Sequence, residues 1–124
     1  MEPVIILNLK VYTESAGQKA LELAQIAESV SKDTGVPIYV APPAPDLAWV
    51  AKNVKIPVFA QHADDVKPGA ATGTVTLEGI KASGCLGSLV NHAEHKITLA
   101  EIRSLVERAM HLDLRTGLQT LREL

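Results

Sequence analysis

Short apolar runs alternate with longer amphipathic stretches along the whole chain. The apolar runs predict strands, because strands buried on both faces of a parallel sheet are almost continuously apolar; they are residues 4–9, 37–41, 57–61 and 86–91. The amphipathic stretches predict helices and are residues 15–34, 46–53, 77–83 and 98–112. Such alternation predicts one α/β domain over residues 1–124, with parallel strands joined by right-handed crossovers.

Two of the predicted helices carry signals at their ends. Ser15 with Gln18, and Thr98 with Glu101, have the spacing of a capping box, and Gly35 stands where a glycine stop is expected. Apolar residues at helical spacing support the first helix: Ala20, Leu23, Ala24, Ala27 and Val30. Residues 62–75 have no such periodicity and predict a long loop.

Two architectures fit four strand–helix units in a row. One is a small, open, doubly wound sheet, and the other is half of an eight-stranded (β/α)8 barrel. After the last helix, Leu114–Thr116 predicts a shortened fifth strand and residues 120–124 predict the start of a fifth helix. In the half barrel, the first and last strands would present open edges that invite pairing with another chain.

Composition narrows the possible partners and the compartment. The net charge is −2, which argues against nucleic acid and membrane surfaces, since both favour a basic face. No apolar run is long enough to cross a membrane. Cys85 is the single cysteine and suits inert packing in a reducing compartment, so we expect a cytoplasmic protein.

Polar residues follow the predicted strands, at the end where parallel sheets carry their functional groups. Asn8 and Lys10 lie two residues apart, so on an extended strand they share a face. His92 could act as a general acid or electrophile, and Glu94 could hold Lys10 in place. The alternatives are a surface lysine, a structural histidine and a solvated glutamate.

The sequence also offers candidate residues for a metal site and for a phosphate loop. His62, Asp64 and Asp65 could be combined with His92, but the sequence has no CxxC or HxxxH pattern, so we expect no metal. The 69–73 segment lacks the Gly-Lys-Ser/Thr ending of a phosphate loop.

Five motifs that occur in a fixed order and spacing give a more specific indication of fold and function. They are Asn8-Leu9-Lys10-Val11-Tyr12, Val40-Ala41-Pro42, Pro57 to His62, Lys67 to Gly73, and Asn91-His92-Ala93-Glu94. In their order and spacing the chain resembles the triosephosphate isomerase family, and it is most similar to the shorter archaeal-type branch. The resemblance covers the chain up to its fourth helix and implies the N-terminal half of a TIM (β/α)8 barrel.

The resemblance also implies an activity and a set of site residues. The family interconverts dihydroxyacetone phosphate and glyceraldehyde 3-phosphate, in glycolysis and gluconeogenesis, without a cofactor. By this resemblance Asn8, Leu9 and Lys10 bind the substrate, with Leu9 contributing only backbone. Lys10 and His92 are catalytic, and Glu94 supports Lys10. The resemblance further implies that His92 acts as a neutral imidazole that polarises the substrate carbonyl, as is established for the family.

Further implications concern assembly. Thr72 matches the residue that one subunit inserts near its neighbour's active site, which implies a homo-oligomer, a dimer or tetramer. Ala93 stands where serine is usual, and His95 where a longer polar residue is common. The family's glutamate base and its phosphate-binding loops lie in the second half of a barrel of about 250 residues, so we expect this chain to lack them.

These implications leave a second function open. The chain could be a non-catalytic half barrel that self-associates, with two copies closing edge to edge, and that binds only small phosphorylated metabolites.

Overall fold

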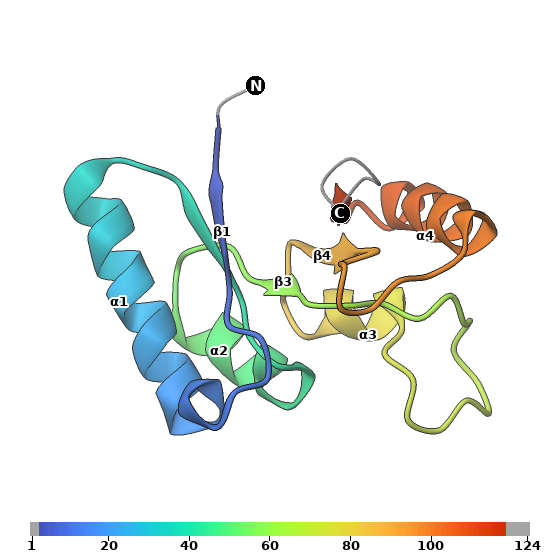
Figure 1. Ribbon diagram of the computed structural model, residues 1–124, viewed down its shortest axis with the longest axis horizontal. Helices are drawn as coiled ribbons and strands as arrows, with labels where there is room; N and C mark the ends of the chain where they lie inside the picture. Colours follow the sequence, from blue (N-terminus) through green and yellow to red (C-terminus); the bar gives the residue numbers. More distant parts are fainter. Residues whose placement is uncertain (1–2, 119–124) are drawn as a thin grey trace.

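The computed structural model describes residues 3–118 of the chain (Figure 1). The strands are β1 (Ile5–Asn8), β2 (Ile38–Ala41), β3 (Phe59–Ala60), β4 (Gly87–Val90) and β5 (Arg115–Leu118). The α-helices are α1 (Gln18–Thr34), α2 (Leu47–Asn53), α3 (Leu77–Ala82) and α4 (Leu99–His111), and two short 3-10 helices are η1 (Thr13–Ser15) and η2 (Ala44–Asp46). None of the helices within residues 3–118 has the length and apolar character needed to span a membrane.

All the strand pairs are parallel, and the strands lie side by side in their order along the chain. β1 pairs with β2, and β3, β4 and β5 form a second sheet in that order. A single bridge between Val40 and Val58 joins the two sheets. A doubly wound sheet would reverse its strand order part way, whereas consecutive order is that of a (β/α)8 barrel. The fold is therefore half of such a barrel.

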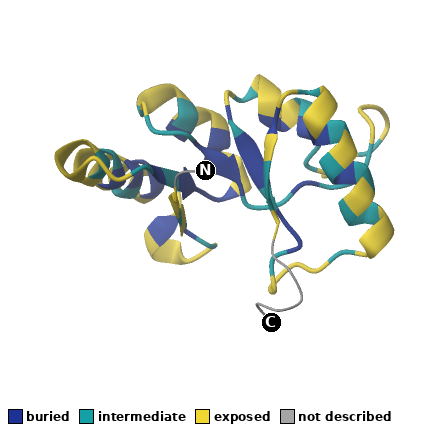
Figure 2. Ribbon diagram, turned by 90° about the horizontal axis from the view of Figure 1, so that it is seen from above, coloured by how far each residue is buried: buried dark blue, intermediate teal, exposed yellow. Residues whose placement is uncertain are grey.

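The main core lies between the strands and the helices, where Figure 2 shows the buried segments facing each other. Val40 and Val90 from the strands meet Ala24 of α1, Ile80 of α3 and Leu105 of α4, all at most 1% exposed. Small and branched aliphatic side chains fill this layer, as expected from a chain that is only 3% aromatic.

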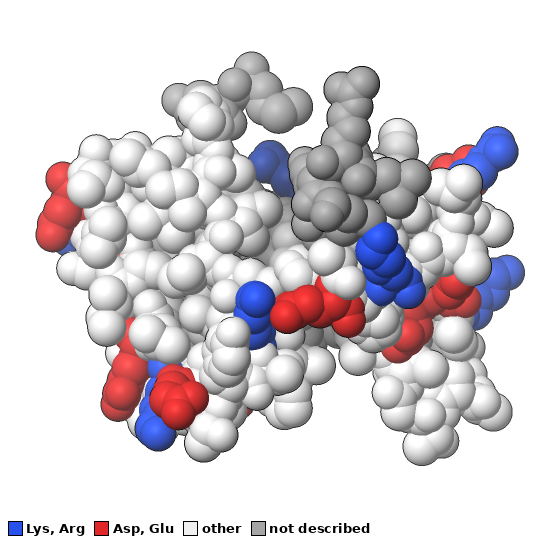
Figure 3. All heavy atoms as spheres, viewed as in Figure 1, with Lys and Arg blue, Asp and Glu red and all other residues white. Residues whose placement is uncertain are grey.

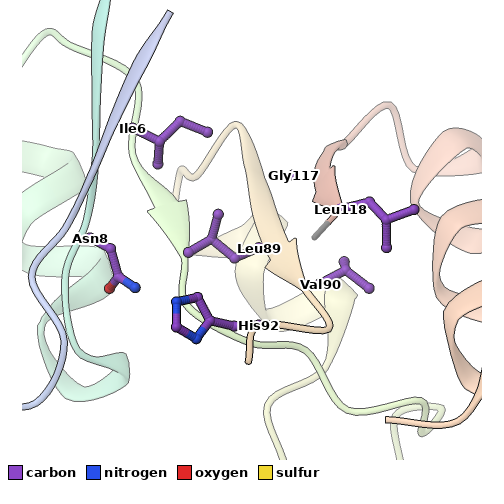
Figure 4. Close-up of a pocket in the computed structure, with 7 residues that line it drawn as sticks. All are labelled: Ile6, Asn8, Leu89, Val90, His92, Gly117 and Leu118. Carbon is purple, nitrogen blue, oxygen red and sulfur yellow. The ribbon is translucent and has the colours of Figure 1, made fainter. Parts of the chain in front are cut away.

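The inner face of the half barrel keeps the layered packing of a closed barrel. A Cβ placed on Gly117 would lie 3.0 Å from Leu89 Cδ2, 3.6 Å from Phe59 Cε2 and 3.7 Å from Ile6 Cδ1. Side chains from β1 and β3 thus converge on β5, and alternate strands fill one layer in such barrels. Beside this layer a cavity of about 320 Å³ opens, lined by Ile6, Asn8, Leu89, Val90, His92, Gly117 and Leu118 (Figure 4).

The helix ends show one correct and one wrong prediction. Thr98 and Glu101 form the expected capping box, with the Glu101 N–H donating to Thr98 Oγ1 at 3.1 Å. Ser15 does not cap α1, because it lies in η1 and α1 begins only at Gln18; its hydroxyl donates to the Leu9 carbonyl at 2.6 Å. Gly17, with φ of 62°, occupies the N-cap instead.

Other details of the helices and strands also differ from the prediction. Gly35 ends α1 as expected, with φ of 74°, but Val30 is 45% exposed and Leu21 is buried in α1. The fifth strand is present as β5. It begins one residue later than predicted and is not shortened, because its four residues equal the length of β1, β2 and β4. The predicted start of a fifth helix, residues 120–124, lies outside the described residues.

Candidate active site

The segment after β1 places a lysine at the mouth of the half barrel. The Lys10 N–H donates to Asn8 Oδ1 at 3.0 Å, and Lys10 adopts a left-handed conformation with φ of 54°. The strand therefore ends at Asn8. Lys10 lies on the same side as Asn8, as predicted, but a local turn places it there and not the alternation of an extended strand. Leu9 is 6% exposed in the core, with its N–H on the Ala41 carbonyl at 3.0 Å. Its substrate-binding role stays a prediction.

A tight turn after β4 presents His92. Asn91 has φ of 59°, and its Oδ1 accepts the Ile97 N–H at 3.1 Å. The Glu94 N–H donates to His92 Nδ1 at 3.0 Å, and the His95 N–H donates to the His92 carbonyl at 2.8 Å. An Nδ1 that accepts a hydrogen bond carries no proton, so the neutral ring has its proton on Nε2 and can donate from that atom.

These two segments meet across the mouth of the half barrel. Lys10 Nζ lies 3.4 Å from Glu94 Oε2, and His92 Nδ1 lies 3.7 Å from Glu94 Oε1. Figure 4 shows Asn8 and His92 approaching the space between β1 and β4 from opposite sides. Together they line a cavity of about 200 Å³, whose lining is Asn8, Lys10, Val11, Gln61, His62, His92, Glu94 and His95.

This arrangement has a definite chemical capacity. An ammonium group and an imidazole N–H beside one small cavity can bind an oxyanion and polarise a carbonyl. Lys10 is 38% and Glu94 61% exposed in their side chains, so their ion pair orients the lysine and contributes little to stability. Figure 3 shows acidic and basic side chains interspersed, without a large area of one sign.

Gln61 is a site residue to which we assigned no role from the sequence. Its Nε2 donates to the Lys10 carbonyl at 2.8 Å and to the Ala41 carbonyl at 3.0 Å. It therefore ties the end of β3 to the segments after β1 and β2. Its place at the end of a predicted strand was the available signal, because site residues gather there.

The candidate metal ligands form hydrogen bonds with different partners. His62 Nε2 lies 2.9 Å from Asp64 Oδ1, whereas Asp65 accepts hydrogen bonds from Arg108 at 3.0 Å and Ser104 at 2.7 Å. Within residues 3–118 no group of three or more His, Cys, Asp or Glu side chains is placed to hold a metal ion.

Two remaining candidates lie away from the cavity. Thr72 is exposed in the long loop, where a partner could reach it. Cys85 is 7% exposed, and burial raises the pKa of its thiol to about 11, which keeps it protonated at neutral pH. This protonation is typical of an inert packing residue.

Comparisons with known proteins bear on the family and the fold of the chain. The family model described as Triosephosphate isomerase matches residues 3–122. The triosephosphate isomerase of Methanocaldococcus jannaschii is 45% identical over 113 residues, which is 91% of this chain and 52% of the relative. That of Caldivirga maquilingensis is 49% identical over 114 residues, 92% of this chain and 51% of the relative.

A solved structure supports the fold independently. The triosephosphate isomerase of Bartonella henselae matches with a TM-score of 0.79 at 20% identity, over 99% of this chain and 54% of that one. The chain spans about half the length of the relatives it matches, and the resemblance to their N-terminal half is confirmed. By its sequence and its half-barrel fold, this chain belongs to the triosephosphate isomerase family.

Proposed function

We propose that this chain supplies the Asn8, Lys10 and His92 part of a triosephosphate isomerase active site. The observation that carries the proposal is the meeting of Lys10, His92 and Glu94 around one cavity, from strands that are distant in sequence. The substrate is a small phosphorylated triose, and the reaction interconverts an aldose and a ketose. The chain acts in the cytoplasm and needs no cofactor.

The proposed roles follow from the atoms that face the cavity. The reaction passes through an enediolate, so its transition state develops negative charge on the carbonyl oxygen. The His92 Nε2–H donates to that oxygen, and the Lys10 ammonium stabilises the charge, with Glu94 holding Lys10 at 3.4 Å. Asn8 fixes the position of the Lys10 backbone through its Oδ1.

Proton abstraction from carbon needs a base that these residues do not provide. In the family this base is the glutamate of the second half, which also carries the phosphate-binding loops. We therefore expect the 124-residue chain to have no isomerase activity by itself, and to become active when a second half closes the barrel.

Complementation tests this proposal directly. The chain is coexpressed, in a host lacking its own isomerase, with the part of the M. jannaschii relative that it does not match. We expect a complex with isomerase activity in a coupled assay. Replacing His92 by Asn should lower the rate by about 10²–10⁴-fold, the usual effect of losing an acid–base group.

The controls separate assembly from catalysis. The C-terminal part alone and the complex with His92→Asn measure the background rate. A well-formed complex with no activity above the His92→Asn complex would reject the proposal.

The alternative function is that of a binding module without catalysis. The exposed strand β1, where Ile5 is 53% exposed, favours association with another chain. Within residues 3–118 the chain already has five strands. Two copies would therefore supply ten strands, whereas the barrel has eight. Closure by two copies would require β5 to leave the sheet in each of them. Assembly through the Thr72 loop into a dimer or tetramer does not meet this obstacle.

The two functions differ in a binding measurement. The module predicts that the chain alone binds a phosphorylated triose analogue and that Lys10→Ala abolishes binding, with no activity in the complementation assay. Sedimentation at micromolar concentration, with Thr72→Arg as the variant, tests the proposed oligomer.

A further inference from the structure

Two histidines stack beside the proposed catalytic residues and have no part in the chemistry described above. His62 follows β3, and His95 lies in the turn after β4. Their ring centroids are 3.5 Å apart and the rings are inclined by only 9°. Both line the same cavity as Lys10 and His92. Contact between an imidazole at the end of β3 and one after β4 is tertiary, and neither local segment requires it.

Asp64 holds His62 in the stack. Its Oδ1 lies 2.9 Å from His62 Nε2, and its Oδ2 accepts the Val75 N–H at 2.7 Å. The Asp64 N–H in turn donates to the Val75 carbonyl at 2.8 Å, so this residue closes the base of the long loop. Burial raises the pKa of Asp64, but the hydrogen bonds from Val75 and His62 and the charges of His62 and His95 lower it overall. Asp64 is therefore ionised beside His62 at neutral pH.

His95 connects this stack to His92. The His95 N–H donates to the His92 carbonyl, and the intervening Glu94 N–H donates to His92 Nδ1. The turn that presents His92 is thus held from one side by β4 and from the other by the stacked rings. A displaced His95 would loosen the bond that fixes the His92 tautomer.

We propose that His62 and His95 are positioning residues for His92 and that the stack responds to protonation. One proton on the pair is tolerated, because Asp64 compensates its charge. A second proton would place two cations 3.5 Å apart, and their repulsion would open the stack. The other charged or titratable groups facing the pair are Lys10, His92 and Glu94.

The importance of the His62–His95 stack for catalysis rests on the proposed function, but the stack itself can be measured without it. Amide hydrogen exchange of Glu94 and side-chain NMR of the four histidines are followed on the 124-residue chain between pH 5 and 8. We expect the protection factor of the Glu94 amide, its exchange rate relative to that of an unstructured peptide at the same pH, to fall in acid, with a step that follows the His62 and His95 signals. His95→Gln should speed this exchange at pH 7.5 by roughly two- to twelvefold, the factor given by an aromatic pair worth about 0.5–1.5 kcal/mol.

Variants separate positioning from general structure. His95→Gln changes an exposed side chain and should lower the thermal unfolding midpoint by only a few degrees, while the acid step linked to the pair disappears. Asp64→Asn should move the step to higher pH, because the neutral amide no longer compensates the charge of a proton on His62 and a single proton then already destabilises the stack. His111→Gln, at the end of α4, is the control and should change neither.

The result that overturns the inference is an acid step and a Glu94 exchange rate that stay the same in both His62→Gln and His95→Gln. This outcome would leave the complementation assay untouched. An inactive complex with a normal pH step would reject only the proposed function.

Discussion

The two sheets of the half barrel are built from the same strand–helix unit but are covered very differently (Figure 2). In β1, Ile5 is 53% and Leu7 39% exposed, whereas β4 is buried at three of its four positions. Among the described strands β1 pairs only with β2, and β4 lies between β3 and β5. Lys10 therefore comes from a lightly supported edge, and His92 comes from a well-packed strand.

We therefore expect the second sheet to contribute more to the stability of the fold, whereas the first sheet contributes Lys10 to the site. The first sheet is joined to the second by the Val40–Val58 bridge and by the Gln61 side chain. Variants in the two sheets should accordingly differ in their effects on the free energy of unfolding.

The largest contrast is expected from one apolar substitution in each sheet. Phe59 of β3 is 2% exposed, so Phe59→Ala should lower the free energy of unfolding by about 3–5 kcal/mol through cavity formation. Ile5→Ala in β1 should cost less than about 1 kcal/mol, because much of this side chain is already in water. Urea unfolding measures both, and equal losses would contradict the comparison.

The connection between the sheets should give the next largest effect. Gln61→Met keeps the side-chain length but removes the donor to the Lys10 and Ala41 carbonyls, which should cost about 1–3 kcal/mol. The lysine should also become less ordered, visible as a changed Lys10 amide shift. Gln25→Met, on the exposed side of α1, is the matched control and should be close to neutral.

A smaller effect is expected from the link between the long loop and the helices of the second sheet. Arg108 contacts Asp65 at 3.0 Å and Glu78 at 3.2 Å, with all three side chains partly buried. Arg108→Met should cost about 1–2 kcal/mol, since it removes the cation that pairs with both carboxylates, although Asp65 keeps its bond from Ser104. The exposed Arg103–Glu107 pair in the same helix provides the control, and Arg103→Met should cost at most about 0.5 kcal/mol.

The smallest effect concerns acid stability and the carboxylate of Asp64. Its pKa is lowered from 3.8 in the folded chain, so its stabilisation is fully present above that value and is lost as pH falls through the folded pKa. Asp64→Asn should therefore cost about 0.5–1.5 kcal/mol at pH 7 and less at pH 3. An equal cost at pH 7 and at pH 3 would show that the charge of Asp64 does not contribute to stability.

Local sequence signals predicted most of the fold but missed the contacts that cross between segments. The Thr98 and Glu101 cap was found because both partners lie within one helical turn. The same reasoning failed at Ser15, because α1 begins only at Gln18. The Gly17 N–H at this helix start donates to Asp46 Oδ2, a tertiary partner of which helix propensity alone gives no warning.

The site was predictable to a similar degree. Asn8, Lys10, His92 and Glu94 could be placed together because parallel strands deliver their ends to one edge. The left-handed turn at Lys10 and the stacking of His95 on His62 depend on how the loops settle after the strands have formed. No spacing rule contains that information.

Gly117 has a consequence for any segment that completes this barrel. Each inner layer takes four side chains from alternate strands, and here Ile6, Phe59 and Gly117 stand at three of these places. The space beside position 117 is already taken by Leu89 of β4, whose Cδ2 lies 3.0 Å from where a Cβ would stand. A segment that completes the barrel therefore meets Leu89 at this level. Glycine in β5 thus lets a β4 side chain of the same half limit the size of the side chain that the other half can supply.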